Sequence, residues 1–327
     1  MTGKHYLLGF DIGGTKCAAI LGTTDGKTMV VVDKEKFSTS EPGGPRQCID
    51  RLVTATRQII ARKGIAITDL TGVGISCGGP LDSRRGVILS PPNLPGWDAI
   101  PVVEWVKNEF DLPVFLQNDA NAGAVAEWKY GAGRGSENMV FLTFGTGLGA
   151  GLIINHRLYA GTNDMAGECG HIRLSEHGPV GYGKAGSFEG FCSGGGIAQL
   201  ARTRVLEVFQ RGGKVSWCEG PAELTGISAR TVGEAAAAGD ELAIDIYRTS
   251  ARYLGRGLSV LIDILNPDTI VIGSVFARSE ALFRAEMEAV IRREALDYAA
   301  RVCRIVPTGL GEAIGDIACL SLAAGGF

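Results

Sequence analysis

The feature that most constrains this chain is a glycine-rich stretch between two apolar runs, from Phe141 to Ile153. Glycine recurs there at positions 145, 147, 149 and 151. Glycine adopts backbone angles closed to other residues and lets the main chain approach a ligand closely. Thr143 and Thr146 add hydroxyl groups, so the turn offers N–H and O–H donors that suit a phosphate. Taken alone, the stretch is equally consistent with a glycine-rich hairpin that binds nothing.

A second stretch near the N-terminus has the same construction. Residues 7–20 form an apolar run, a Gly/Thr turn and another apolar run, which predicts strand, turn and strand. Asp11 stands at this turn, where an isolated hairpin has no need of a carboxylate. Mg²⁺ between the carboxylate and a phosphate would explain it, because Mg²⁺ prefers oxygen ligands. Two such hairpins predict that two halves of the chain hold a nucleoside triphosphate across a cleft.

The length and composition are typical of a globular protein and disfavour a nucleic-acid-binding or membrane-spanning one. With 327 residues, of which 45% are hydrophobic and 20% charged, the chain is long enough for two domains with buried cores. A net charge of -3 gives no basic footprint for nucleic acid. Because no apolar run can span a bilayer and no leader precedes the first strand, we expect a soluble cytoplasmic protein. Its 8 scattered cysteines are then expected to be reduced thiols in or near the core.

Strand and helix patterns alternate along the chain, which predicts an α/β sheet. Beyond the hairpins, we expect strands at 28–37, 72–77, 114–117, 269–273 and 304–306, and helices at 46–62, 100–109, 240–265, 280–294 and 312–324. No low-complexity linker interrupts them, so the domains are expected to pack together or to be joined by a hinge.

Asp119 lies where the expected strand at 114–117 ends and an alanine-rich helix begins. The structural explanation is a helix N-cap, because aspartate and asparagine are favoured there. The functional explanation is that open α/β sheets bind their ligands at the carboxyl ends of strands, where a carboxylate can take a proton from a substrate hydroxyl. One residue can serve both purposes.

A further cluster of polar side chains lies between residues 161 and 196. Glu168, His171 and Glu189 fall within a glycine-dense segment that ends in Gly194–Gly196. Carboxylate and imidazole groups accept or donate hydrogen bonds in fixed directions, which suits hydroxyl groups of a ligand. A lone histidine is usually structural, but the Glu-x-x-His spacing favours a ligand site here.

Four ordered motifs in this chain resemble those of the ROK family, at residues 11–16, 118–121, 144–149 and 168–171. The family contains bacterial sugar kinases, typically glucokinase-like, and sugar-responsive repressors. The resemblance runs nearly end to end and implies the actin-like ATPase fold, with two α/β, ribonuclease H-like domains around a central cleft. The implied domains are a smaller one at 1–118, with the C-terminal helix 312–327 packing back on it, and a larger one at 119–311.

The resemblance also implies roles for individual residues. Asp119 is the implied catalytic base, and the implied sugar contacts are Gly79, Asn93, Asn118, Asp119, Glu168, His171 and Glu189. The implied ATP contacts are Asp11, Gly13, Gly14, Thr15 and Lys16 in one phosphate loop, Thr143, Gly145, Thr146 and Gly147 in the other, and Gly195, Gly273 and Ser274 near the adenosine. Asp11 is also expected to hold Mg²⁺ through water.

The chain departs from the family pattern at two places. Three cysteine positions of the family's zinc motif are occupied here by Val180, Tyr182 and Ser187. Because His171 alone cannot complete a tetrahedral site, we expect no structural zinc. Glycine turns and packing of Tyr182 and Phe188 are expected to hold this segment instead. The second departure is Ser274, which stands where the family commonly has a glycine.

The sequence therefore predicts a glucokinase-like enzyme that transfers phosphate from ATP to a hexose, with the 6-hydroxyl as expected acceptor. We expect a homodimer that binds hexose and ATP, and neither nucleic acid nor membrane. One alternative is a repressor, which the acidic charge and the mere handful of residues before the first strand disfavour. The other is a weakly catalytic or non-catalytic sugar sensor acting in transcriptional regulation, suggested by the two degraded motifs. Glucose, an N-acetylhexosamine, mannose and fructose all remain open as substrates.

Overall fold

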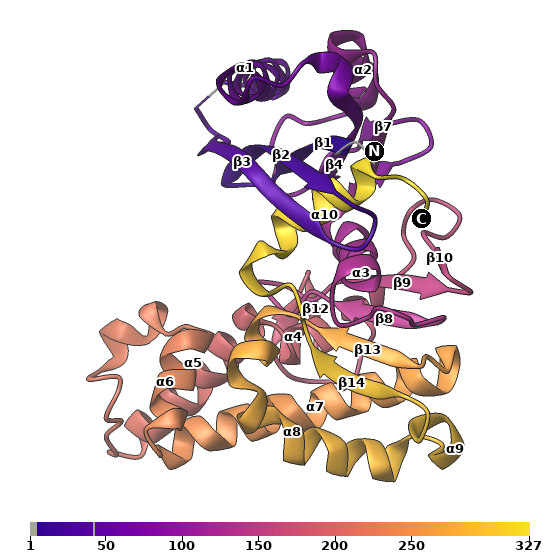
Figure 1. The fold of residues 1–327 in the computed structure, drawn as a ribbon. Helices are drawn as coiled ribbons and strands as arrows, with labels where there is room; N and C mark the ends of the chain where they lie inside the picture. The colour runs from indigo at the N-terminus through magenta and orange to yellow at the C-terminus, as the bar shows by residue number, and fades with distance from the viewer. Residues whose placement is uncertain (1–4, 42) are drawn as a thin grey trace. The chain divides into compact units, whose positions relative to one another are not determined.

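The computed structural model describes residues 5–41 and 43–327. The chain forms two compact units, whose elements are drawn in Figure 1. Unit 1 comprises Met1–Ser136, Gly151–Ala166 and Gly309–Phe327, and unit 2 comprises Glu137–Ala150 and Gly167–Thr308. This division differs from the boundary at residue 118 that the sequence suggested, because helix α3 (Asp119–Tyr130) and the segment after residue 150 belong with unit 1.

Unit 1 is built on a five-stranded sheet in the order β3-β2-β1-β4-β7. The strands are β1 (His5–Ile12), β2 (Lys16–Thr24), β3 (Met29–Ser38), β4 (Leu70–Cys77) and β7 (Val114–Asn118). The first three are antiparallel, β4 runs parallel to β1, and β7 runs parallel to β4. Helices α1 (Pro45–Lys63) and α2 (Val102–Phe110) lie on one face of the sheet and α10 (Ile314–Ala323) on the other (Figure 1).

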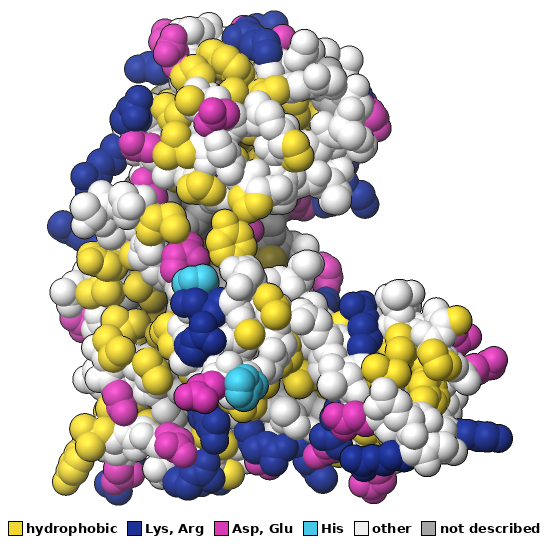
Figure 2. Space-filling view, turned by 180° about the vertical axis from the view of Figure 1, so that it is seen from behind, with side chains coloured by type: hydrophobic (Ala, Val, Ile, Leu, Met, Phe, Trp, Pro, Cys, Tyr) yellow, Lys and Arg dark blue, Asp and Glu magenta, His cyan; other side chains and the backbone are white. Residues whose placement is uncertain are grey.

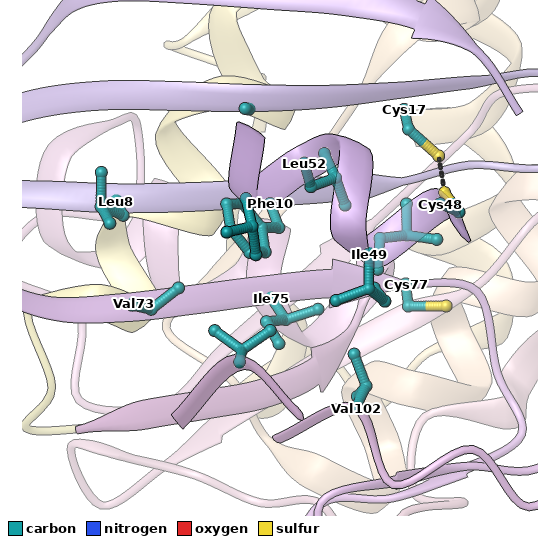
Figure 3. Close-up of a cluster of buried hydrophobic side chains, with 14 of the residues drawn as sticks. Leu8, Phe10, Cys17, Cys48, Ile49, Leu52, Val73, Ile75, Cys77 and Val102 are labelled. Atoms are coloured by element: carbon teal, nitrogen blue, oxygen red, sulfur yellow. Dashed lines mark hydrogen bonds between the residues drawn. The ribbon is translucent and has the colours of Figure 1, made fainter. Parts of the chain in front are cut away.

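The core of unit 1 follows from the two-residue period of its strands. Successive residues of β1 point to opposite faces of the sheet. Leu8 and Phe10 pack in the cluster that contains Leu52 of α1 (Figure 3), whereas Leu7 packs with Leu320 of α10 on the other face. Every residue of this strand interior is therefore buried, as in sheets covered on both sides.

The cysteines add small buried groups to these cores. All eight are free thiols and only Cys303 is not fully buried, which places them in the core as the sequence predicted. Two of them meet: the Sγ atoms of Cys17 and Cys48 lie 3.5 Å apart (Figure 3).

Helix α3 belongs to unit 1 because it packs on the C-terminal helix. Ala122 and Val125 of α3 share a buried cluster with Ile317 and Leu322 of α10. Small alanine side chains let the two helices approach closely, so the alanine-rich sequence serves this contact.

Glu127 ties the end of α3 to the chain that returns from unit 2. Its side chain is fully buried. Its carboxylate accepts hydrogen bonds from the N–H groups of Ala132, Gly309 and Leu310 at 2.8 to 3.1 Å. A buried carboxylate is stable only when its oxygens are satisfied in this way, so Glu127 has a structural role that the sequence did not indicate.

The second sheet has the order β10-β9-β8-β13-β14. Its strands are β8 (Met139–Leu142), β9 (Ala150–Ile154), β10 (Arg157–Leu158), β13 (Thr269–Ile272) and β14 (Arg304–Pro307). Strands β8, β13 and β14 are parallel, and β9 and β10 form an antiparallel pair. The helices of unit 2 are α4 (Phe188–Phe191), α5 (Gly194–Gln210), α6 (Ala229–Ala237), α7 (Glu241–Leu265), α8 (Ser274–Glu294) and α9 (Asp297–Ala300).

Short elements complete the chain. Two hairpins pair β5 (Leu81–Asp82) with β6 (Val87–Ile88) and β11 (Val180–Gly181) with β12 (Lys184–Ala185). Single turns of 3₁₀ helix occur at η1 (Ile67–Asp69), η2 (Glu168–His171), η3 (Pro221–Gly226) and η4 (Gly311–Ala313). Throughout the described ranges, every helix is too short or too polar to cross a membrane.

The predicted α/β class is confirmed. Each strand and helix expected from the patterns is present, and apart from the start of α8 each lies within a few residues of its expected bounds. Helices α5 and α6 were not predicted. Helix α5 begins with three glycines, and glycine has a low helix propensity, so the sequence did not indicate a helix there. Ser193 is the N-cap of this helix. Helix α8 begins at Ser274, earlier than the expected residue 280, but its backbone is kinked at Ser279, where φ is -127°. The predicted start therefore corresponds to the part of α8 that follows the kink.

Candidate active site

The first phosphate turn joins β1 to β2 in unit 1. Its backbone closes on itself, since Gly13 N donates to Lys16 O at 3.0 Å. Thr39 holds the turn from the end of β3: its Oγ1 donates to Gly13 O at 2.6 Å and its N–H donates to Thr15 O at 3.1 Å. Gly14, Thr15 and Lys16 are exposed, so their donors are accessible to a ligand.

Two predicted sugar contacts of unit 1 lie beside this turn. A methyl group added to Gly14 would come 2.6 Å from the main-chain oxygen of Asn93, and one added to Gly78 would come 3.0 Å from Asn93 Oδ1. Gly79 has open space where a side chain would project. The turn, Asn93 and Gly79 therefore form one neighbourhood within unit 1.

The sequence left two roles open for Asp119, helix N-cap and general base, and the structure assigns the cap to Asn118. Asn118 is the N-cap of α3, because its Oδ1 accepts the N–H of Asn121 at 2.7 Å. Asp119 is the first residue of the helix, and its Oδ1 accepts the N–H of Ala120 at 2.8 Å. The capping explanation thus applies to Asn118, and Asp119 is not needed as the cap.

The environment of Asp119 favours its protonated form more than water does. Its side chain keeps an exposed surface, yet protein atoms crowd it at longer range. This desolvation raises the pKa of Asp119 above its usual value, and the N–H of Ala120 opposes the rise. A carboxylate with a raised pKa is a stronger base than a free one, as proton abstraction requires.

Asp11 lies at the end of β1, and burial is the main cause that raises its pKa to about 6. Repulsion from Asp316 and Asp119 adds to the rise, whereas Lys36 and Lys34 oppose it. Lys34 pairs with Asp316 at 2.6 Å. This end of the unit 1 sheet therefore carries surplus negative charge.

That surplus fits a divalent cation. Mg²⁺ is usually held by one or two carboxylates together with substrate phosphates and water. Across residues 5–41 and 43–327, no three His, Cys, Asp or Glu side chains converge to hold a metal by themselves. Asp11, beside a phosphate-sized turn, can supply a carboxylate ligand. The phosphate ligands have to come from a bound nucleotide, and the remaining ligands from water.

The second phosphate turn joins β8 to β9 and is closed by its own hydrogen bonds. Thr143 N donates to Gly149 O, and Gly149 N donates to Thr143 Oγ1, each at 3.0 Å. Gly145 N donates to Gly147 O, also at 3.0 Å. The Thr143 hydroxyl is thus engaged inside the turn, while the side chain of Thr146 is exposed.

The start of α5 is bonded to the same turn. Gly194 N donates to Gly145 O at 2.7 Å, and Gly195 N donates to Thr146 O at 3.3 Å. These N–H groups hold the second turn in place. The role of Gly195 in contacting adenosine stays a prediction, and the structure adds this second function for its backbone.

The predicted sugar segment η2 is also attached to the second turn. Ala150 N donates to Gly167 O at 3.1 Å, and a methyl group on Gly170 would lie 2.1 Å from Leu148 O. Glu168 and His171, at the two ends of η2, are both exposed. These two sugar candidates therefore sit on backbone that is fixed to the phosphate turn.

Glu189 has a contact that the sequence did not reveal. Its Oε2 accepts the N–H of Leu148, inside the second turn, at 3.0 Å. A methyl group on Gly147 would lie 2.7 Å from the same oxygen. Gly147 thus leaves room for a carboxylate as well as for a ligand. Glu189 and Leu148 are 41 residues apart in the chain, so no local signal in the sequence indicated this contact.

The segment that replaces the zinc motif is held by turns and caps. Gly183 and Gly186 have left-handed φ values of 75° and 67°, and Ser187 Oγ caps α4 by accepting the N–H of Gly190 at 3.0 Å. Phe188 is fully buried, as expected. The expected packing of Tyr182 was wrong: its side chain is 73% exposed and meets the ring of His171 edge-on.

Ser274, the other departure, begins α8. Its φ is 40°, in the left-handed region that a β-carbon makes costly. The preceding Gly273 donates its N–H to Leu142 O at 2.9 Å, which fixes this junction to the end of β8. The backbone therefore has the shape that favours glycine, although a serine occupies it.

Comparison with known proteins identifies the family. Residues 7–325 match the ROK family over almost the whole chain. The chain belongs to the ROK family. A glucokinase of Streptomyces coelicolor is 34% identical over 267 residues, 81% of this chain and 80% of the relative. A xylose repressor of Bacillus spizizenii is 24% identical over 94% of this chain and 74% of the relative.

Solved structures agree with this assignment. A ROK family glucokinase from Streptomyces griseus in complex with glucose and AMPPNP has a TM-score of 0.76 at 30% identity, covering 99% of this chain and 100% of that one. A ROK hexokinase from Thermus thermophilus has a TM-score of 0.77 at 28% identity, covering 98% of both chains. These likenesses support a ROK sugar kinase of the actin-like ATPase superfamily, so the resemblance and the fold expected from it are confirmed.

Proposed function

We propose that this ROK protein transfers the γ-phosphate of ATP to the 6-hydroxyl of a hexose, in the manner of a glucokinase. The observation that carries the proposal is that Asn118 caps α3, so that the carboxylate of Asp119 remains available to act on a substrate hydroxyl. The relatives include glucokinases, and one solved relative holds glucose and AMPPNP.

In this proposal Asp119 is the general base. Its carboxylate takes the proton from the sugar hydroxyl, and the resulting oxygen attacks the γ-phosphate. The raised pKa of Asp119 favours that proton transfer. Asn93, Gly79 and Asn118 in unit 1, and Glu168, His171 and Glu189 in unit 2, orient the hexose by hydrogen bonds.

The phosphate groups are held by backbone donors. Unit 1 supplies the turn from Gly13 to Lys16, and unit 2 supplies the turn from Thr143 to Gly149. Stabilising the charge of the transferred group is the main task in phosphoryl transfer. Asp11 would hold Mg²⁺ through water, and the bound cation would neutralise phosphate charge.

A regulatory role is the competing proposal, and the xylose repressors among the relatives support it. The charge balance of the chain, at -3, does not favour nucleic acid. On the face shown in Figure 2, basic and acidic side chains are interspersed. We therefore place the kinase first, and we further propose that it works as a homodimer in the cytoplasm.

Product analysis tests the proposal. Purified protein is incubated with ATP, Mg²⁺ and one sugar at a time from glucose, mannose, fructose and N-acetylhexosamines, and the products are followed by ³¹P NMR. We expect one sugar to yield a 6-phosphate in step with ADP. Sugar binding by calorimetry without any phosphorylated product would support the sensor instead.

A further inference from the structure

Glu189 is a predicted sugar contact that is also hydrogen-bonded to the second phosphate turn within unit 2. Its Oε2 accepts the N–H of Leu148 at 3.0 Å. Leu148 is buried and the hydrogen bond is partly buried, so loss of the acceptor leaves an N–H that is poorly solvated. Hydrogen bonds that a carboxylate accepts are stronger than those between neutral groups.

The second turn is shaped to receive this carboxylate. A methyl group on Gly147 would lie 2.7 Å from Glu189 Oε2, closer than real side-chain carbons approach. Gly170 of η2 is also close, since its added methyl would lie 3.3 Å from Glu189 Cβ and 2.1 Å from Leu148 O. Glu189 is therefore enclosed by the turn and the sugar segment.

The other carboxylate oxygen has no such engagement. In the described part of the chain, Oε1 of Glu189 makes no hydrogen bond, and the side chain is half-buried. A carboxylate offers two oxygens that can accept in different directions. One oxygen can hold the turn while the other accepts from a ligand hydroxyl.

We infer that Glu189 is a positioning residue for the second phosphate turn and that it couples hexose binding to ATP binding through its two oxygens. The inference rests on the proposed function for the identity of the two ligands. Its structural half, the support of the turn by Oε2, does not depend on turnover. A hexose that orients the carboxylate through Oε1 also stabilises the bond from Leu148 N to Oε2.

The first test measures the affinity for AMPPNP by calorimetry in the absence of sugar. Glu189→Ala removes the hydrogen-bond acceptor of Leu148 N, so we expect the affinity to fall about tenfold or more. Glu189→Gln keeps an oxygen for Leu148 N and should restore the affinity to within about threefold of the original. His171→Asn is the matched comparison, because it alters a predicted sugar contact that has no bond to the turn.

Gly147→Ala supplies an independent arm if Glu189→Ala fails to fold. The added methyl displaces the carboxylate, so AMPPNP affinity should fall about tenfold in the original chain. In a Glu189→Ala background the same methyl meets no oxygen, and the further loss should be below about twofold. Equal losses in both backgrounds would mean that Gly147 makes room for the phosphate alone, and would overturn the inference.

The proposed function and the role of Glu189 can be contradicted by different measurements. Unchanged AMPPNP affinity in Glu189→Ala, with glucose affinity lost, would leave Glu189 as a sugar contact only and would overturn the inference. Absence of sugar phosphorylation by the unaltered protein would overturn the proposed function, while the AMPPNP measurements would still decide the role of Glu189. For the coupling itself, glucose should tighten AMPPNP in the original chain and not in Glu189→Ala.

Discussion

Asn93 lies directly against Gly14: a methyl group on Gly14 would come 2.6 Å from the main-chain oxygen of Asn93 and 2.9 Å from its Cβ. A phosphate turn and a predicted sugar contact therefore share one surface in unit 1, as Gly147 and Glu189 do in unit 2. In both places the glycine makes room for a protein group that is expected to bind the other substrate.

This contact predicts that Gly14→Ala weakens both ligands. The methyl group must displace Asn93, so glucose and AMPPNP affinities should each fall about tenfold or more, because each loses well-placed hydrogen bonds. Gly220→Ala is the control, since nothing lies within 4 Å of an added methyl there. Calorimetry that found AMPPNP binding lost and glucose binding unchanged would show that Asn93 does not contact the sugar.

Asp11 is expected to lower the stability of the ligand-free protein. Its pKa is raised from 3.8 to about 6, so the folded chain holds the proton more tightly than the unfolded chain. The destabilisation is therefore absent below pH 3.8 and complete above about pH 6.

The change Asp11→Asn should remove this penalty. A shift of this size corresponds to at most about 3 kcal/mol, and partial exposure reduces it to about 1–2 kcal/mol. Urea unfolding without Mg²⁺ should show Asp11→Asn more stable at pH 8 and equal to the original near pH 4. A variant that is less stable at pH 8 would contradict the assigned cause of the shift. Activity should nevertheless be lost.

Ser274 gives a test of backbone strain. Its φ of 40° is costly for any residue with a β-carbon. Ser274→Gly and Ser274→Ala both lose the hydrogen bond that Ser274 Oγ accepts from Arg278, but only the glycine variant relieves the strain. The glycine variant should be more stable than the alanine variant by about 1 kcal/mol in urea unfolding. Equal stabilities would show that the chain relaxes at this position.

Zinc content tests the reading of the segment around Tyr182. Without the three cysteines, the free energy that binds zinc is largely missing. Cys192 does not compensate, because its buried thiol donates to Ser250 O at 3.5 Å. Elemental analysis should find no stoichiometric zinc, and excess Mg²⁺ should restore activity after EDTA. One zinc per chain, with activity lost for good on stripping, would contradict this reading.

The sequence predicted the fold well because its signals are local. The apolar periods of β1, α1 and α7 and the glycine turns after β1 and β8 are each visible within one short segment. Family motifs then supplied the arrangement of these parts. Helix α5 was not predicted, because the glycines at its start are typical of a loop, although Ser193 caps it.

The contacts that hold the site together could not be predicted in the same way. Glu189 to Leu148 and Asn93 to Gly14 join residues far apart in the chain, and their geometry depends on how whole elements pack. The division between Asn118 as cap and Asp119 as candidate base depends on one hydrogen bond that either residue could have made. Such choices are made by tertiary structure rather than by composition or spacing.

The most direct test of the account is the turnover of Asp119→Asn. The amide keeps the shape of the carboxylate and removes its ability to take a proton, while Asn118 continues to cap α3. Steady-state kinetics on the best hexose should show kcat reduced by about two to four orders of magnitude. Calorimetry should find glucose and AMPPNP affinities within about threefold of the original, because capping and phosphate contacts are unchanged. A kcat close to that of the original protein would remove Asp119 from the mechanism.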